Sequence, residues 1–291
     1  MKHYLLIILI LAVKVSIAQF ENTDIGARAV ALCGAFTSMS DNSLAIFYNP
    51  SGLGQNKFRE LSVFYSPAPY GLKELSTAAL TYCEPFRFGT FGAGIKTYGY
   101  ELYREFNFIL SYGNVYKKRI FYGLNLNYYN LNIKDYNSAS SFGLDIGAMI
   151  YITDFMRWGV FAKNVSGSTI GLSKEKIAQV YRTGFSVQPR GDLFFILEAE
   201  KDVMNPVSVR GAMEYSILDF LDLRAGVSTN PSTFSGGIGF CYEIFQLDYA
   251  LYNSFDLGLT HQGSLTINFG GKGARKSARE LLKNAFKSIN N

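Results

Sequence analysis

Residues 257–269, LGLTHQGSLTINF, alternate between two chemistries along their whole length. Every second residue from Leu257 is apolar, apart from His261 and Gly263, and the residues between them are small or polar. Successive side chains of a strand point to opposite faces, so the segment is predicted to be a strand with one apolar face. At about 3.3 Å per residue it would be about 40 Å long, far beyond the common globular strand. Because a tilted strand crosses a bilayer with about 9–11 residues, this segment indicates a transmembrane barrel.

The same alternation recurs upstream, and we expect about fourteen strands from residue 60 onward. The clearest lie at 122–128, 142–150, 207–215, 221–227 and 245–251, and weaker ones at 60–66, 75–83, 88–98, 104–113, 156–164, 179–188, 192–200 and 233–242. Short and longer connections take turns between them, as in outer-membrane barrels, whose short turns gather on the periplasmic side. We therefore predict an all-β fold, a transmembrane antiparallel β-barrel of about fourteen strands. The alternative, a soluble all-β protein with one polar face per sheet, explains the strand length and the loop pattern less well.

The composition agrees with a barrel. Aromatic residues make up 15% of the chain, which the aromatic girdles at the two bilayer interfaces would account for. A mean hydropathy of +0.07 is low for a helical membrane protein but normal for strands that are half polar. The net charge of +5 is modest and argues against nucleic acid as a partner.

The first eighteen residues are organised as an export signal. Lys2 gives a basic start, residues 4–13 are apolar, and Ser16 and Ala18 are small residues at positions −3 and −1 of a cleavage site. We expect cleavage after Ala18, so that the mature protein begins at Gln19 and leaves the cytoplasm. Together with the barrel pattern, this predicts a protein of the bacterial outer membrane, surrounded by its lipid.

Residues 19–57 do not alternate, and they are rich in small residues. Ser40 and Ser43 flank a stretch that can cap a short helix over residues 44–48, and Asn49-Pro50-Ser51-Gly52 has the composition of a turn. Small residues let backbones pack closely. We therefore expect this segment to fold inside the barrel lumen as an N-terminal plug.

The run GARAVALCGAFTSMSDNSLAIFYNPSGLG, residues 26–54, resembles the N-terminal signature of the FadL-like outer-membrane proteins, and in particular the PorV/PorQ group. The residues that carry the resemblance are Gly26, Arg28, Gly34, Asp41, Asn49, Pro50 and Gly52. Cys33-Gly34 stands where two glycines would be more usual. The resemblance implies a barrel of fourteen strands with a lumenal plug, in agreement with the count above.

The resemblance also implies two functions. Some members of the family import hydrophobic molecules, so passive transport of small hydrophobic molecules across the outer membrane is the first expectation. Others are accessories of the type IX secretion system, so a non-transporting role beside secretion-system subunits is the alternative. The chain is short for a fatty-acid importer, and its longest loop, residues 165–178, is largely polar.

Strand parity predicts which side chains point into the lumen. A charged Arg or Lys on the lipid face costs about 2–4 kcal/mol at the midplane, so charged positions are expected inside. They are Lys96, Asp145, Arg182, Glu198, Glu200, Arg210, Glu214, Asp222, Arg224 and Asp248, with Phe194 and Ile196 as an apolar pair of the same parity. The arginines could bind a ligand carboxylate, or the charges could pair with one another and with Arg28 and Asp41. The apolar pair could line a path for cargo or pack on the plug.

Catalysis finds little support in the sequence. The two histidines are His3, in the signal, and His261, on the apolar face of the last strand, so we expect neither a catalytic triad nor a metal site. No enzyme activity and no cofactor are predicted. Residues 58–270 are assigned to the barrel, and residues 271–291 are expected to form a basic periplasmic tail with helical periodicity.

Overall fold

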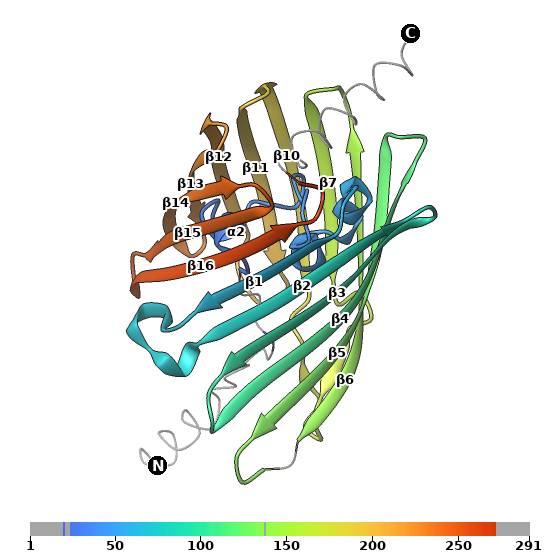
Figure 1. Cartoon of the computed structure of the whole chain (residues 1–291). Helices are drawn as coiled ribbons and strands as arrows, with labels where there is room; N and C mark the ends of the chain where they lie inside the picture. The colour runs from blue at the N-terminus through green and yellow to red at the C-terminus, as the bar shows by residue number, and fades with distance from the viewer. Residues whose placement is uncertain (1–19, 21–23, 137, 272–291) are drawn as a thin grey trace, which may run out of the picture.

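The computed structural model describes residue 20, residues 24–136 and residues 138–271. Fourteen strands in this part of the chain close into one antiparallel barrel (Figure 1). They are β1 (Glu60–Ser66), β2 (Thr77–Phe86), β3 (Gly89–Gly99), β4 (Tyr103–Tyr116), β5 (Ile120–Ile133), β6 (Ala139–Tyr151), β7 (Met156–Lys163), β10 (Val180–Arg190), β11 (Leu193–Asp202), β12 (Ser208–Leu218), β13 (Leu221–Thr229), β14 (Ser232–Tyr242), β15 (Phe245–Ser254) and β16 (Gly258–Asn268). The prediction of a barrel of about fourteen strands is confirmed. The expected signal and most of the expected tail lie outside the described residues.

The barrel closes between its first and last strands. Leu61 of β1 stands opposite Ile267 of β16 on one side and opposite Tyr82 of β2 on the other. Each barrel strand therefore has a hydrogen-bonded neighbour on both sides. Closure removes the open sheet edges that would leave backbone groups unsatisfied in lipid.

The outer face of the barrel is apolar and the inner face is largely polar. On β5, the side chains of Tyr122, Leu124 and Leu126 are 45–47% exposed, whereas Asn125 and Asn127 are at most 1% exposed. β16 has the same sidedness, because Leu259 and Leu265 are exposed and Thr260 and Ser264 are buried. The predicted parity therefore holds on both strands.

The connections divide the barrel into two rims. One, the short-turn rim, carries the turns at residues 87–88, 117–119, 152–155, 191–192, 219–220 and 243–244. The other, the long-loop rim, carries the loops at 67–76, 100–102, 134–138, 164–179, 203–207, 230–231 and 255–257. The length contrast comes mainly from loops 67–76 and 164–179, since 230–231 is as short as a turn. The predicted alternation is thus present but uneven.

Loop 164–179 also completes part of the wall. β6 pairs with β7 only from Ile146 to Tyr151, and the earlier part of β6 has no strand on that side. Val165 N donates to Leu144 O at 2.8 Å instead, and the loop folds into a small hairpin of β8 (Thr169–Ile170) and β9 (Glu175–Lys176). Backbone groups of a broken wall must be satisfied, and this loop satisfies part of them.

Between residues 24 and 59, the chain forms three short helical turns, α2 (Ala27–Val30), α3 (Ala45–Tyr48) and η1 (Pro50–Gln55). The expected helix at 44–48 is present, but it starts one residue later, and Asn42 Oδ1 rather than a serine accepts the Leu44 N–H at 3.1 Å. Among the described residues, no helix has the length and apolarity to cross a membrane.

Candidate functional site in the barrel interior and at the long-loop mouth

Residues 24–56, called here the N-terminal segment, lie inside the barrel, and all but Asp24 and Phe47 are buried. Figure 1 shows this blue segment surrounded by strands. Its backbone and side chains contact opposite parts of the wall. Ala27 N donates to Ser264 Oγ on β16 at 2.7 Å, Thr37 N to Glu198 Oε2 on β11 at 2.8 Å, and Asn49 Nδ2 to Ala148 O on β6 at 3.2 Å.

Glycines on the inner wall let this segment approach closely. A Cβ placed on Gly123 of β5 would lie 2.4 Å from the carbonyl carbon of Pro50. A Cβ on Gly226 of β13 would lie 2.6 Å from the carbonyl carbon of Leu32. Real Cβ atoms do not come so close to backbone, so only glycine permits this contact. The wall and the segment are therefore fitted to each other.

The glycines of the sequence motif permit close contacts within the segment and between the segment and β12. Gly34 has φ 72°, in the left-handed region, and a Cβ there would lie 2.2 Å from Nη1 of Arg210. Gly26 precedes α2, and Gly52 lies against the carbonyl of Ser40. The motif thus places tight packing at three points along the segment.

Asn49 and Pro50 hold the second half of the segment against its middle and against the wall. The Asn49 amide donates to Thr37 O at 2.9 Å, and its Oδ1 accepts from Ser51 N at 3.2 Å and Ser51 Oγ at 2.6 Å. Pro50 occupies the start of η1, where its missing N–H costs nothing. The turn predicted from the sequence is therefore an Asn-capped helical turn that contacts β4, β5 and β6.

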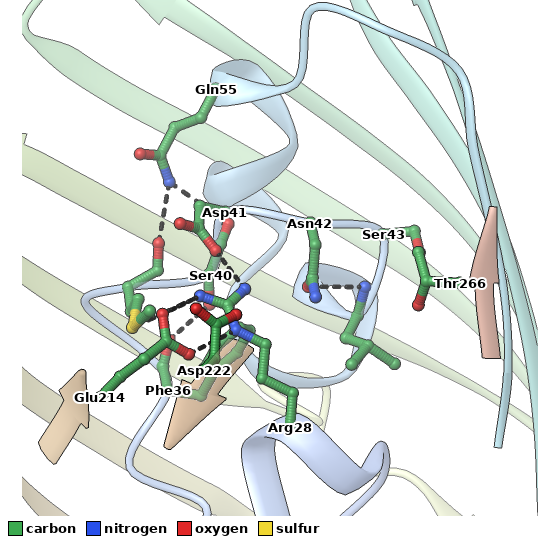
Figure 2. A network of polar contacts seen from close by, with 12 residues as sticks. Arg28, Phe36, Ser40, Asp41, Asn42, Ser43, Gln55, Glu214, Asp222 and Thr266 are labelled. Atoms are coloured by element: carbon green, nitrogen blue, oxygen red, sulfur yellow. Dashed lines mark hydrogen bonds and ion pairs between the residues drawn. The ribbon is translucent and has the colours of Figure 1, made fainter. Parts of the chain in front are cut away.

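Arg28 stands at the centre of a buried ion network (Figure 2). Its Nη1 donates to Asp41 Oδ1 at 2.6 Å, and its Nε and Nη2 donate to the two oxygens of Glu214 at 2.7 and 2.8 Å. Glu214 also accepts from Arg224 Nε at 2.7 Å, and Arg224 reaches Asp248 Oδ1 at 2.7 Å. The side chains of Arg28 and Arg224 are at most 1% exposed. Such charges persist inside a protein only when each is paired and hydrogen-bonded.

A second network lies between β10, β11 and β12. Arg182 Nε contacts Glu200 Oε2 at 2.5 Å, and Arg210 Nη2 contacts Glu200 Oε1 at 2.6 Å. Asp24 of the N-terminal segment lies 3.4 Å from Arg210 and 3.9 Å from Arg182. Of the two interpretations of the arginines, the geometry favours pairing within the protein over a vacant carboxylate clamp.

The remaining sequence candidates lie on the inner wall at separate places. Phe194 and Ile196 pack in one apolar cluster with Phe36 and Met39 of the N-terminal segment. Asp145 of β6 accepts from the Asn125 and Asn127 amides at 3.0 and 2.8 Å and from Asn164 N at 2.8 Å. Lys96 is buried on β3. These residues form no single constellation with the arginines.

Several buried interior residues were not among the predicted lumen-facing positions. Phe64, Ile109 and Phe121 are buried apolar side chains on the inner wall, at positions that strand parity alone would have found. Phe20, by contrast, lies in a cluster with Tyr129, Leu131, Ile170 and Ile177. Its ring meets Tyr129 edge to face at 4.9 Å, and its N–H donates to Glu105 Oε1 at 3.0 Å. No local sequence pattern predicts that contact, because it joins segments that are far apart in the chain.

A cavity of about 700 Å³ opens at the long-loop rim. Its apolar lining includes Tyr70, Leu72 and Leu75 of loop 67–76 and Leu257 beside β16. Its polar lining includes Asp24, Glu200, Asp202 and Arg210. The cavity therefore extends from surface loops to the second ion network and the N-terminal segment.

Loop 67–76 folds into the mouth of the barrel. Tyr70 N donates to Thr260 Oγ1, an inward side chain of β16, at 2.9 Å, and Tyr70 has φ 56°. A left-handed non-glycine residue is strained, so this contact helps to hold the loop in place. Burial raises the pKa of the Tyr70 phenol above its ordinary value.

The potential ligands of a metal ion are dispersed. Among the described residues, no three His, Cys, Asp or Glu side chains come together as a metal site, and the three cysteines form no disulfide. His261 faces outward, with Nδ1 2.5 Å from the Tyr249 hydroxyl.

No family model matches the chain, and no curated protein matches it. Solved structures do. The monoaromatic hydrocarbon channel CymD is 12% identical in sequence to this chain, with a TM-score of 0.64. The matched region covers 86% of this chain and 99% of the CymD chain. The toluene transporter TodX of Pseudomonas putida is 12% identical with a TM-score of 0.62, covering 84% and 98%. A FadL homologue of Pseudomonas aeruginosa is 11% identical with a TM-score of 0.59, covering 85% and 99%.

These likenesses define the class of the fold. The chain is a closed barrel of fourteen antiparallel strands with the architecture of FadL-like outer-membrane channels. At sequence identities of 11–12%, the structural similarity shows the fold alone.

Proposed function

We propose that this protein lies in the bacterial outer membrane and passes small hydrophobic molecules passively across it. The observation that carries the proposal is the cavity of about 700 Å³ at the long-loop rim. Sites for small molecules occupy about 300–1,000 Å³ and combine apolar walls with a few polar groups. The similar structures are those of a hydrocarbon channel and a toluene transporter, which also agrees with a protein that is not an enzyme.

The lining of the cavity narrows the class of cargo. Tyr70, Leu72 and Leu75 offer apolar contact, whereas Asp24, Glu200 and Asp202 outnumber the one arginine of the lining, Arg210. A neutral molecule with one hydrogen-bonding end fits such a cavity, and a carboxylate does not. We therefore expect para-cresol to pass at least as well as toluene, and benzoate poorly.

The N-terminal segment would act as the plug of this channel. It fills the interior with apolar clusters and paired charges, so cargo would move by contact with protein rather than through an open aqueous pore. We also place the chain in the PorV/PorQ group, on the motif between residues 26 and 54. The alternative role in type IX secretion gains no support from the similar structures.

The test is uptake into proteoliposomes by the full-length protein. Leu72→Asp/Leu75→Asp places two charges in the cavity, and Leu102→Asp/Leu172→Asp places two on exposed loop positions that do not line it. Burying a leucine side chain stabilises by about 1.5–3 kcal/mol, so the cavity variant should lower uptake of toluene and para-cresol by about tenfold or more. The control variant should transport like the wild type. Wild-type uptake no faster than in protein-free vesicles would overturn the proposal.

A further inference from the structure

The short-turn rim is divided by charge into two arcs. On the arc formed by β2 to β5 and by the approach to β1, the exposed charged residues at the rim are basic, namely Lys57, Arg59, Arg87, Lys117 and Lys118. On the arc from β6 to β15, the turns carry Asp154, Asp192, Asp219 and Glu243, and of these Asp192 is paired with the exposed Arg190 at the end of β10. A rim that only had to be soluble would have no reason to separate its charges in this way.

Part of the basic charge is already compensated. Arg59 Nε contacts Glu84 Oε1 at 2.7 Å. Among the described residues, by contrast, no carboxylate oxygen lies within 4 Å of Arg87, Lys117 or Lys118. These three cations therefore present their charge to whatever faces this arc.

The backbone conformation of the β4–β5 turn is a second, independent observation about the two lysines. Lys117 and Lys118 have φ 47° and 55°, and Arg119 N donates to Tyr116 O across them at 3.2 Å. A hairpin turn whose two central residues are both left-handed normally contains Asn-Gly or Gly-Gly. Two lysines are strained in this conformation. The turn therefore carries basic residues at positions where the backbone would favour glycine or asparagine.

Directly beside these turns the outer wall carries an aromatic patch. The rings of Phe86, Phe88, Phe91 and Tyr112 lie with neighbouring centroids 5.1–5.8 Å apart, and Phe86 and Phe88 are 51% and 62% exposed. The Tyr112 hydroxyl donates to Phe88 O at 2.6 Å, and Asn114 Nδ2 donates to the same oxygen at 2.9 Å. The β2–β3 turn is thereby tied to the end of β4, and the patch and both turns form one unit.

We propose that this unit, Arg87, Lys117 and Lys118 with the aromatic patch, binds anionic phospholipid of the leaflet at the short-turn rim. Aromatic rings that face outward from a barrel wall lie at the level of the lipid headgroups. Cations just beyond them meet the phosphates, and each is worth about 1 kcal/mol at an anionic surface. A soluble acidic partner would use the charges but would leave the sideways-facing rings without contact. The inference needs a barrel in a bilayer and does not depend on transport.

The experiment measures lipid retention. Full-length protein is reconstituted in nanodiscs of equal phosphatidylcholine and phosphatidylglycerol, released into detergent, and its bound lipids are counted by native mass spectrometry. We expect phosphatidylglycerol to be retained over phosphatidylcholine. At about 1 kcal/mol for each basic residue, Arg87→Gln/Lys117→Gln/Lys118→Gln should weaken that preference about 100-fold. Lys73→Gln/Lys174→Gln/Lys176→Gln removes the same charge from exposed positions on the long-loop rim and should retain it.

Three outcomes would overturn the proposal. They are equal retention of the two lipids by the wild type, equal loss in both triple variants, and full displacement of the lipid by inorganic phosphate. Heat-dependent mobility on gels checks that both variants remain folded barrels. Toluene uptake in vesicles of phosphatidylcholine alone is measured separately. A failed uptake assay with intact lipid preference would then count against the proposed transport and not against the lipid site.

Discussion

Arg28 and Glu214 lie 186 positions apart in the chain and form two parallel hydrogen bonds inside the barrel, at 2.7 and 2.8 Å. The fork of the guanidinium matches the two carboxylate oxygens, which fixes both the distance and the orientation of the partners. Glu214 in turn contacts Arg224, so the position of the N-terminal segment is coupled to β12 and β13. This pair is the point where the segment and the wall depend on each other most directly.

Replacing Arg28 with methionine should destabilise the protein strongly. The change removes the ion pair of the buried Asp41 and one of the two arginines that pair with Glu214, and breaking a buried pair from one side costs about 3–5 kcal/mol. The free energy of unfolding from urea titrations measures the effect. Arg190→Met is the control, because its pair with Asp192 is exposed to solvent and its loss should change stability little. Similar losses in both variants would contradict the assignment.

Gly123→Ala should loosen the contact between the wall and η1. The new Cβ meets the backbone of Pro50, and overpacking of this kind typically costs about 1–3 kcal/mol. Limited proteolysis should cut the N-terminal segment faster than in the wild type. Gly263→Ala, on a strand position with open space around it, should leave the cleavage rate unchanged. A slow, wild-type rate in Gly123→Ala would refute the fitted contact.

Asn49→Ala should free the segment locally without unfolding the barrel. The amide bridges Thr37 O and Ala148 O, and an unsatisfied buried carbonyl costs about 1–3 kcal/mol. Hydrogen exchange should rise at residues 49–55 and stay unchanged in β10 to β13. The exposed Asn132→Ala serves as the control. Protection that is the same in both variants would show that Asn49 does not hold the turn.

Thr260→Val should release loop 67–76. Valine keeps the volume of threonine but removes the acceptor of the Tyr70 N–H. A hydrogen bond contributes about 0.5–1.5 kcal/mol, so the Tyr70 amide should exchange about 2–10 times faster. Thr97→Val on β3, at a half-buried position away from this contact, should have no such effect. Unchanged exchange in Thr260→Val would mean that the loop is held by other contacts.

The strands and their sidedness were predictable because alternation is a local property. β16 and β5 each follow a period of two that any reader of the sequence can count, and the exposed and buried sets of the structure agree with it. The same parity places Phe121 and Asn125 inside, although the predicted lumen-facing set contained neither. The partner of Arg28 could not be predicted from the sequence. Glu214 and Arg224 both have inward strand parity, and no local feature of the sequence decides whether these charges pair with one another or bind a ligand.

The sequence by itself determined the class of fold, the outward apolar face and the set of inward charges, since each of these follows from neighbouring residues. Only the tertiary structure decided how those charges pair, how Gly123 and Gly226 admit the N-terminal segment, and where a cavity opens between loop 67–76 and Asp24. The reason is physical. A cavity and an ion network depend on distances between segments far apart in the chain, and those distances are set only when the barrel closes between β1 and β16.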